Sequence, residues 1–256
     1  MGDWNSELYM KFESERTRAA RDLLAQVSDI KPKTVFDLGS GPGNSTQLLV
    51  EAFPDAEVVG IDDSPNMLEV ARARVSGARF LKEDIERWRP SEPADLIFAN
   101  ATLHFALDHY GLIKRLAGCL AKGGCLAAQM PNNMQEVSHA LMRMIAADGP
   151  WSDRLVPIAK TRAVIGPLDE YYRLLRPLCS RLDIWQTTYI HTIDGVDRIV
   201  EWFEGSELRP FLKPLSEQER EAFLARYREG LTQSYAPQSD GTVLLPYPRL
   251  FLVAQK

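Results

Sequence analysis

The stretch Lys33-Thr-Val-Phe-Asp-Leu38, which continues as Gly39-Ser-Gly41-Pro-Gly43, decides the fold of this chain. Its first part is a short apolar run with β-branched residues, which is typical of a buried strand. The glycines predict a tight turn, and an apolar stripe at helical spacing follows from Leu48 to Phe53. We therefore predict a strand, a glycine turn and a helix, the first half of a βαβ unit.

The same alternation of strands and helices continues along the chain. Strands are predicted at 33–38, 57–61, 78–81, 94–99, 125–130, 181–192 and 250–254. Helices between the first five strands imply right-handed crossovers and a parallel sheet with helices on both faces. The last two strands are expected to run antiparallel. The prediction is an α/β fold with a doubly wound, mostly parallel seven-stranded sheet of Rossmann-like type.

We expect one domain, residues 1–256, with helical insertions that form a cap. The expected parts are lead-in helices over 1–30, a cofactor-binding parallel core over 33–131, and helical cap insertions over 132–178 and 195–240. Residues 132–149 look helical, whereas 151–167 look irregular. Ser216-Glu-Gln-Glu219 has the capping-box pattern that begins a helix.

The charge balance excludes a general basic surface. Thirty Lys and Arg residues against 35 Asp and Glu residues give a formal net charge of -5, so nucleic acid and anionic membranes are not expected partners. Three cysteines without CxxC spacing, and no apolar run long enough for a membrane span, favour a cytoplasmic protein. The four histidines lack metal-site spacing, so no metal is predicted.

The glycine turn has the features of a nucleotide-binding loop. In open α/β sheets, ligands bind at the carboxyl ends of the strands, and glycines allow the backbone to approach them closely. A nicotinamide dehydrogenase would carry G-x-G-x-x-G, but Asn44 occupies the last position of that pattern. Asp62, at the end of the second strand, could accept hydrogen bonds from both ribose hydroxyls. Alternatively, the glycines only make a turn and Asp62 only caps the next helix.

The order D-x-G-x-G-x-G from Asp37, together with Asp62, resembles the first two motifs of class I S-adenosylmethionine-dependent methyltransferases. This resemblance implies S-adenosylmethionine as cofactor and S-adenosylhomocysteine as product. It implies that Asp84 binds the adenine amine, that Ile85 covers the ring and that Asn100 lies beside the methionyl part. The matched cofactor positions are Asp37, Gly39, Ser40, Gly41, Gly43, Asp62, Asp84, Ile85 and Asn100.

Over nearly its whole length the chain resembles the trans-aconitate 2-methyltransferase family. The matching stretches include Asp3-Trp-Asn5, Leu8-Tyr9, Glu15-Arg-Thr-Arg18, Gly41-Pro-Gly-Asn-Ser-Thr46, Gly60-Ile-Asp62, Gln129-Met-Pro131, Leu208-Arg-Pro210 and Pro248-Arg-Leu-Phe251. The resemblance implies methyl transfer to a carboxylate of a small polycarboxylic acid, giving a monomethyl ester. The chain departs from the family at His104 and Phe105, where Gln and Trp are more common, and at Asn132, where Asp is usual.

This chemistry requires positioning rather than a general base, because a carboxylate with a pKa of about 4 is already ionised at neutral pH. Arginines suit the remaining carboxylates of the substrate, since their planar fork binds carboxylate in a bidentate manner. The candidates for substrate binding are Arg16, Arg209, Arg249 and His104. Trp4, Tyr9 and Phe12 are candidates for covering the cofactor, although aromatics at this spacing also fill cores.

Other functions stay open at this point. A related methyltransferase could act on another small acid, a hydroxyl or an amine. A non-catalytic module that binds S-adenosylmethionine is a different class of function, and a nicotinamide dehydrogenase is weakened by Asn44. The expected partner is a small polycarboxylate, and no obligate protein partner is evident.

Overall fold

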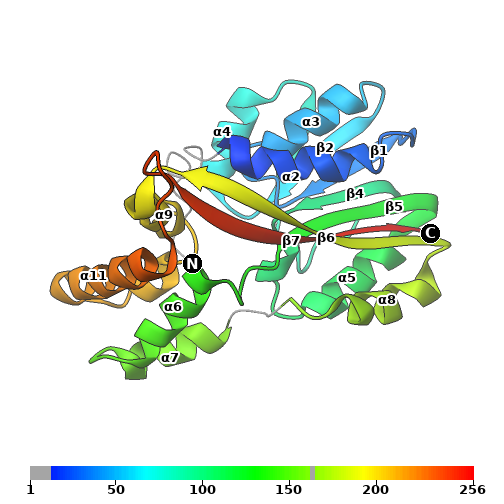
Figure 1. Ribbon diagram of the computed structural model, residues 1–256. Coiled ribbons are helices and arrows are strands. Elements are labelled where there is room, and N and C mark those ends of the chain that lie inside the picture. The colour runs from blue at the N-terminus through cyan, green and yellow to red at the C-terminus, as the bar shows by residue number, and fades with distance from the viewer. Residues whose placement is uncertain (1–12, 162–164) are drawn as a thin grey trace. The chain divides into compact units, whose positions relative to one another are not determined.

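The computed structural model describes residues 13–161 and 165–256, without the side chains of 13–16 and 161 (Figure 1). The chain forms two compact units. Unit 1 comprises Met1–Pro131, Ile165–Thr187 and Leu250–Lys256, and unit 2 comprises Asn132–Val164 and Thr188–Arg249. Residues 165–178, expected in the first cap insertion, fall in unit 1 because Tyr171 and Leu175 are buried in its core.

The sheet confirms the predicted fold class. Its strands are β1 (Thr34–Leu38), β2 (Glu57–Asp62), β3 (Ala78–Lys82), β4 (Ala94–Asn100), β5 (Leu120–Pro131), β6 (Arg181–Ile193) and β7 (Val243–Gln255). Their order is β3-β2-β1-β4-β5-β7-β6, and the pairs among the first five strands are parallel. The chain reverses its direction of winding between β1 and β4, which is where such folds bind ligands.

The last two strands are antiparallel additions, as predicted. The Gly123 N–H donates to Lys256 O at 3.0 Å, and the Asn132 N–H donates to Pro248 O at 2.8 Å. These two bonds show that β7 runs antiparallel to β5. Likewise Ser180 N–H binds Gln255 O, and the ring of Trp185 stacks on Phe251, so β6 runs antiparallel to β7.

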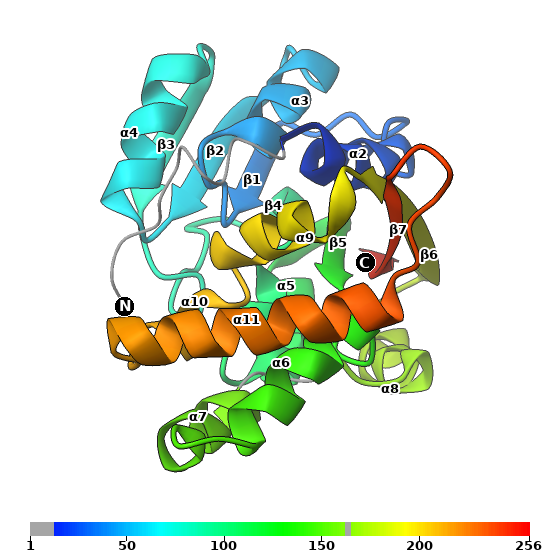
Figure 2. The same ribbon diagram turned by 60° about the vertical axis from the view of Figure 1, so that its left-hand side comes forward.

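Helices cover both faces of the sheet in unit 1. They are α2 (Glu13–Ala25), α3 (Asn44–Ala52), α4 (Pro65–Arg74), η1 (Leu103–Phe105), α5 (His109–Gly118), α8 (Leu168–Leu175) and η2 (Arg176–Leu178). Helices α2, α3 and α4 lie on one face, and α5 and α8 lie on the other (Figures 1 and 2). Helix α4 begins as predicted, because the Ser64 hydroxyl accepts the Met67 N–H and Pro65 occupies the first turn.

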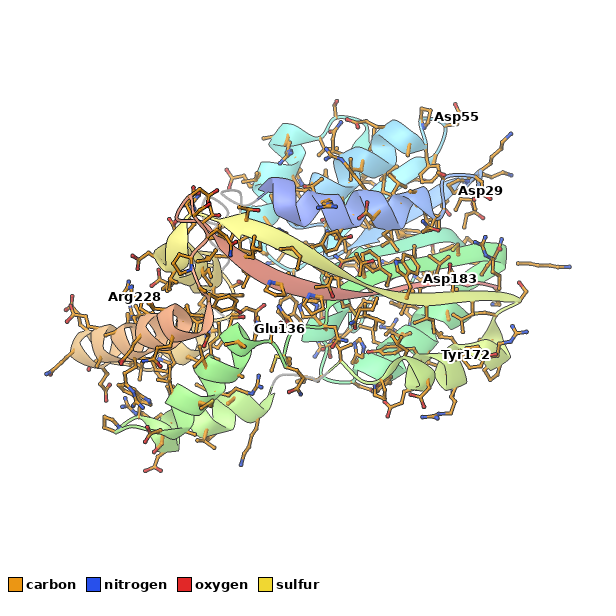
Figure 3. All side chains as sticks on the ribbon, in the orientation of Figure 1. Asp29, Asp55, Glu136, Tyr172, Asp183 and Arg228 are labelled. Carbon is orange, nitrogen blue, oxygen red and sulfur yellow. The ribbon has the colours of Figure 1, made fainter. Side chains whose placement is uncertain are left out.

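The helix α8 shows how neighbouring residues divide between core and solvent. Tyr171 is buried against α5, whereas Tyr172 is half exposed and points outward (Figure 3). The hydroxyl of Tyr171 lies 2.8 Å from His109 Nε2, and His109 Nδ1 lies 2.9 Å from Leu103 O. His109 therefore connects α8 to η1 through one buried side chain.

Unit 2 is mostly helical. It contains α6 (Val137–Ala147), α7 (Ser152–Thr161), α9 (Gly195–Glu204), α10 (Arg209–Leu212) and α11 (Glu217–Ser234). The capping box at Ser216 and Glu219 is present as predicted. Helix α11 packs closely on α6, because the Tyr227 hydroxyl donates to Ser138 O and Gly230 leaves room for the side chain of Leu141.

One secondary-structure prediction was wrong. Residues 151–167 looked irregular, but α7 forms over most of this stretch, with Pro157 inside it. Trp151 anchors its start, since the ring is buried and its N–H donates to Ile145 O at 2.8 Å. None of the described helices is long and apolar enough to cross a membrane.

Candidate active site

The glycine turn between β1 and α3 is held by the next strand. Gly39, Gly41 and Gly43 all have positive φ, at 65°, 52° and 90°. The N–H groups of Gly39 and Ser40 both donate to Ile61 O, at 2.7 and 3.0 Å. A Cβ on Gly39 would lie 2.1 Å from Thr102 Oγ1, so the turn also packs tightly against the residue that follows β4.

Gly41 faces open space instead. A Cβ built there would meet no described atom within 4 Å. Beside it, Ser40 is buried, and its hydroxyl has no hydrogen-bond partner among the described residues. A partly exposed glycine next to a buried hydroxyl without a partner is a cradle that fits the polar part of a ligand such as S-adenosylmethionine.

Asp62 connects this cradle to the second strand. Its Oδ2 accepts the Gly41 N–H at 2.9 Å, and its Oδ1 accepts the Ser64 N–H at 2.9 Å. The cap of α4 comes from the Ser64 hydroxyl, so Asp62 is not needed for capping. The carboxylate at this strand end presents acceptor oxygens of the kind that a pair of ribose hydroxyls would bind.

Asp37 lies behind the turn. It is fully buried, and its Oδ2 accepts the hydroxyls of Ser45 at 2.8 Å and Thr46 at 2.6 Å. Burial raises the pKa of Asp37 to about 7; the two hydroxyl bonds oppose this rise, and the charge of Asp62 adds to it. Asp37 thus joins β1 to the first turn of α3 and fixes the shape of the glycine turn.

The loop after β3 carries Asp84 and Ile85, the two residues predicted to contact the adenine ring. Asp84 is half exposed, its Oδ1 accepts the Glu86 N–H at 2.8 Å, and Arg87 Nε lies 3.8 Å from Oδ2. Ile85 is partly buried and packs against the core of unit 1. This strand end therefore presents a half-exposed carboxylate next to a partly buried apolar side chain.

Two residues near Asn100 were not assigned to the site from the sequence: Gln129 on β5, and Ala101, which follows β4. The Asn100 Oδ1 accepts a hydrogen bond from the side-chain amide of the fully buried Gln129. Ala101 has a φ of 54°, and its N–H donates to Gln129 O at 2.9 Å. The sequence did give a signal for Gln129, because it is the polar residue in the otherwise apolar run 125–130. Nothing in the sequence marks an alanine for left-handed backbone, which costs on the order of 1 kcal/mol.

The substrate candidates are divided among several places. His104 is buried on η1, with its ring 4.0 Å from that of Phe105, which is half exposed. In unit 2, Arg249 is buried with its guanidinium 4.8 Å above the Tyr247 ring, and Arg209 is partly buried at the start of α10. Arg16 lies in α2, but its side chain lies outside the described part of the structure, as do Trp4, Tyr9 and Phe12.

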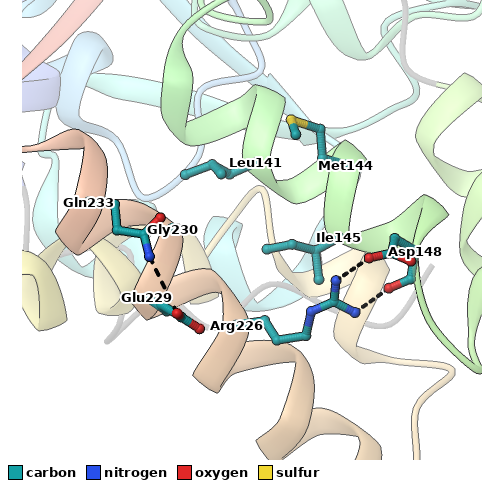
Figure 4. A pocket seen from close by; sticks show the side chains of 8 residues that line it. All are labelled: Leu141, Met144, Ile145, Asp148, Arg226, Glu229, Gly230 and Gln233. Atoms are coloured by element: carbon teal, nitrogen blue, oxygen red, sulfur yellow. Dashed lines mark hydrogen bonds and ion pairs between the residues drawn. The ribbon is translucent and has the colours of Figure 1, made fainter.

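A separate pocket within unit 2 lies between α6 and α11 (Figure 4). Its charged and polar side chains bind one another, because Arg226 pairs with Asp148 and the Gln233 amide donates to Glu229. It includes none of the residues predicted to bind cofactor or substrate. Among the described residues, no group of three His, Cys, Asp or Glu side chains could hold a metal ion.

Residues 35–124, which contain the glycine turn and Asp62, match a family model described as a methyltransferase domain. Over all 256 residues the chain is 49% identical to the trans-aconitate 2-methyltransferase of Rhodopseudomonas palustris strain HaA2, and both chains are fully covered. The chain belongs to the trans-aconitate 2-methyltransferase family. Two other enzymes of the same name show a similar match. The one from Methylobacterium nodulans is 50% identical over 100% of this chain and 99% of its own, and the one from Yersinia pestis is 46% identical over 99% of this chain and 98% of its own. The prediction of a methyltransferase is confirmed.

Solved structures share the fold of this family member at low sequence identity. The YcgJ protein from Bacillus subtilis matches with a TM-score of 0.61 and 14% identity, covering 93% of this chain and 98% of the other. A phosphoethanolamine N-methyltransferase from Haemonchus contortus, solved with S-adenosylhomocysteine, matches with a TM-score of 0.54 and 15% identity, covering 93% and 52%.

Proposed function

We propose that the protein transfers the methyl group of S-adenosylmethionine to a carboxylate of trans-aconitate, giving the monomethyl ester and S-adenosylhomocysteine. The observation that carries this proposal is the bond from the Gly41 N–H to Asp62 beside open space, at the end of β1. It occurs in a chain related over its full length to enzymes named for this reaction.

The cofactor is assigned to residues of unit 1. Asp62 binds the ribose hydroxyls, and the turn from Gly39 to Gly43, with Ser40, receives the methionyl part. Asp84 accepts a hydrogen bond from the adenine amine, and Ile85 packs against the ring. Asn100, oriented by Gln129, lies near the methionyl group, and Asp37 acts indirectly by fixing the turn.

The reaction needs no general base from the chain. When bound, the cofactor supplies a methyl group on a sulfonium sulfur, which becomes a neutral thioether after the carboxylate oxygen attacks the methyl carbon. The acceptor is already ionised at neutral pH, so the protein must orient it and exclude water, and such positioning contributes about 7–11 kcal/mol in favourable cases. His104, Arg16, Arg209 and Arg249 remain the candidates that bind the acid, on the basis of their charge or hydrogen-bonding capacity.

The experiment is mass spectrometry of reactions that contain the purified protein, methyl-labelled S-adenosylmethionine and one acceptor each. The acceptors are trans-aconitate, cis-aconitate, isocitrate and small hydroxyl or amine compounds. We expect a labelled monomethyl ester with trans-aconitate at the highest rate. A faster transfer to another acceptor would change the assigned substrate. Binding of the cofactor without transfer to any acceptor would instead favour the non-catalytic module.

We also propose a cytoplasmic location. Cys119, Cys125 and Cys179 are all free thiols, which suits a reducing compartment. Two of them are buried, and burial raises the pKa of Cys125 to about 12, so this thiol is unreactive at neutral pH.

A further inference from the structure

The loop that carries Asp84 contains a hydrogen-bonded turn. The N–H groups of Arg87 and Trp88 both donate to Asp84 O, at 3.0 and 2.8 Å. An isolated turn of this kind leaves its later carbonyl groups without partners in the backbone. The shape of the loop, and with it the direction of the Asp84 carboxylate, therefore depends on bonds from outside the turn.

Arg115 supplies these bonds from α5. Its Nη1 donates to Trp88 O at 2.8 Å, and its Nη2 donates to Ile85 O and Glu86 O, both at 3.0 Å. Three carbonyl groups of the loop thus bind one guanidinium, whose donors are fixed in a plane. Arg89 also donates to Trp88 O, but it belongs to the same segment and cannot tie the loop to the core.

Two further contacts support the same arrangement. Trp88 is buried, with its ring 4.9 Å from that of Phe36 on β1, so the end of the loop is anchored in the core. The Glu86 carboxylate accepts the N–H of Leu107, just before α5, at 2.8 Å. Arg115 adds bonds to the backbone carbonyl groups of Ile85 and Glu86, which neither of these two contacts reaches.

We propose that Arg115 is a positioning residue that holds the loop 84–88 in the shape that receives the adenine ring of the cofactor. It acts through the backbone of Ile85, Glu86 and Trp88 rather than by contact with the cofactor. This proposal rests on the proposed function, because it takes Asp84 as the residue that binds the adenine amine.

The test compares Arg115→Met with Lys114→Met. Both variants remove one positive charge from the same turn of α5, but Lys114 is exposed and makes no bond to the loop 84–88 among the described residues. Arg115→Lys serves as a milder variant, which keeps the charge but replaces the planar fork of donors with a single ammonium group. Circular dichroism first establishes that each variant is folded, and if Arg115→Met is not, Arg115→Lys replaces it in every measurement.

Amide hydrogen exchange of the free protein reports on the loop itself. We expect faster exchange at residues 84–88 in Arg115→Met than in the wild type, and wild-type exchange in Lys114→Met. Calorimetry then measures the binding of S-adenosylhomocysteine and of S-inosylhomocysteine, in which a carbonyl replaces the adenine amine. We expect Arg115→Met to weaken S-adenosylhomocysteine binding about tenfold, which corresponds to about 1.4 kcal/mol, and to reduce the preference over the inosyl compound.

Wild-type affinity and wild-type preference in a folded Arg115→Met protein would overturn the proposal. So would an equal loss for both compounds, because a general disturbance of the site does not act on the amine alone. A third variant, Asp84→Ala with Arg115 intact, separates the role proposed for Asp84 from the role proposed for Arg115. If it leaves the preference for S-adenosylhomocysteine intact, the assignment of Asp84 under the proposed function fails, whereas the exchange result still tests the bonds from Arg115.

Discussion

At the scale of single residues, Gly39 and Gly41 both have positive φ but differ in their surroundings. A Cβ on Gly39 would collide with Thr102, whereas one on Gly41 would enter open space. We expect Gly39→Ala to destabilise the protein strongly. Gly41→Ala should cost only the strain of left-handed backbone, about 1–2 kcal/mol, yet abolish cofactor binding. Thermal unfolding and calorimetry measure the two effects.

Gly123 provides the control for that pair. It also has positive φ, at 80°, a Cβ added to it would meet no described atom within 4 Å, and it lies on β5 in the same unit. Gly123→Ala should lose similar stability to Gly41→Ala and keep its affinity for S-adenosylhomocysteine. Equal affinity in Gly41→Ala and Gly123→Ala would show that the open space at Gly41 does not receive the cofactor.

Asp62 and its neighbour Asp63 allow a second comparison. The Asp62 carboxylate binds two backbone N–H groups, whereas Asp63 is exposed. Asp62→Asn should weaken S-adenosylhomocysteine binding by about 1.5–3 kcal/mol for each charge-assisted ribose bond that is lost. Asp63→Asn should bind normally in the same calorimetric titration. Normal binding by both variants would remove Asp62 from the ribose site.

Some residues of the candidate site could be predicted from the sequence, and others could not. Gly39, Gly41 and Asp62 were predicted because glycine and aspartate have distinct backbone and charge properties, so their spacing carries information. Ala101 could not be predicted, since alanine rarely adopts positive φ and only the surrounding structure holds it there. The three carbonyl contacts of Arg115 depend on α5 lying beside the loop 84–88, which no local pattern encodes.

At the scale of elements, Asp37 couples β1 to α3 in a pH-dependent way. Its pKa is about 7 in the folded protein against an ordinary value of 3.8, so between these values the folded state holds a proton that the unfolded state has lost. This contribution to stability is complete below about pH 4 and declines as pH rises towards 7, at up to about 1.4 kcal/mol per pH unit.

Asp37→Asn tests this coupling, because asparagine keeps an acceptor for Ser45 and Thr46 but does not ionise. We expect the variant to gain free energy of unfolding relative to the wild type as pH rises from 5 to 7, and the difference to level off above that range. Urea denaturation at several pH values measures it. Parallel curves for the two proteins would mean that Asp37 is already ionised in the fold.

The bonds of His109, which connect α8 to η1, give a second prediction at the scale of elements. Burial lowers the pKa of His109, and its Nδ1 must carry the proton because Leu103 O only accepts, so Nε2 accepts the hydroxyl of Tyr171. Tyr171→Phe should cost about 1–3 kcal/mol by leaving this buried nitrogen unsatisfied. Tyr172→Phe, on the exposed side of the same helix, should change the free energy of unfolding by less than about 0.5 kcal/mol. Chemical denaturation compares them, and equal costs would contradict the buried bond.

At the scale of the whole molecule, all the residues assigned to the cofactor belong to unit 1. A ligand that binds only the folded state, present at 100 times its Kd, raises the free energy of unfolding by about 2.7 kcal/mol. We therefore expect saturating S-adenosylhomocysteine to slow amide exchange in β1, β2 and β4 much more than in α11. Equal protection in α11 would indicate that the two units open together. The same ligand concentration should protect Asp62→Asn less.

The division into units was the part of the architecture that the sequence described least well. The alternation of strands and helices predicted the sheet, because each parallel strand must be followed by a crossover. The return of residues 165–187 to unit 1 depends instead on Tyr171 and Leu175 finding places in a core formed by residues far away in the sequence. Apolar spacing shows that a helix has a buried face, but not which unit covers it.

The position of β7 has a consequence for synthesis of the chain. It is synthesised after the other six strands of the described sheet, yet it lies inside that sheet, between β5 and β6. Until it emerges, β5 has an open edge and β6 has no neighbouring strand in the described sheet. Until β7 is made, nascent chains therefore expose unpaired edges of both β5 and β6 while most of the apolar core is already present, and this is the period in which they most need protection from aggregation.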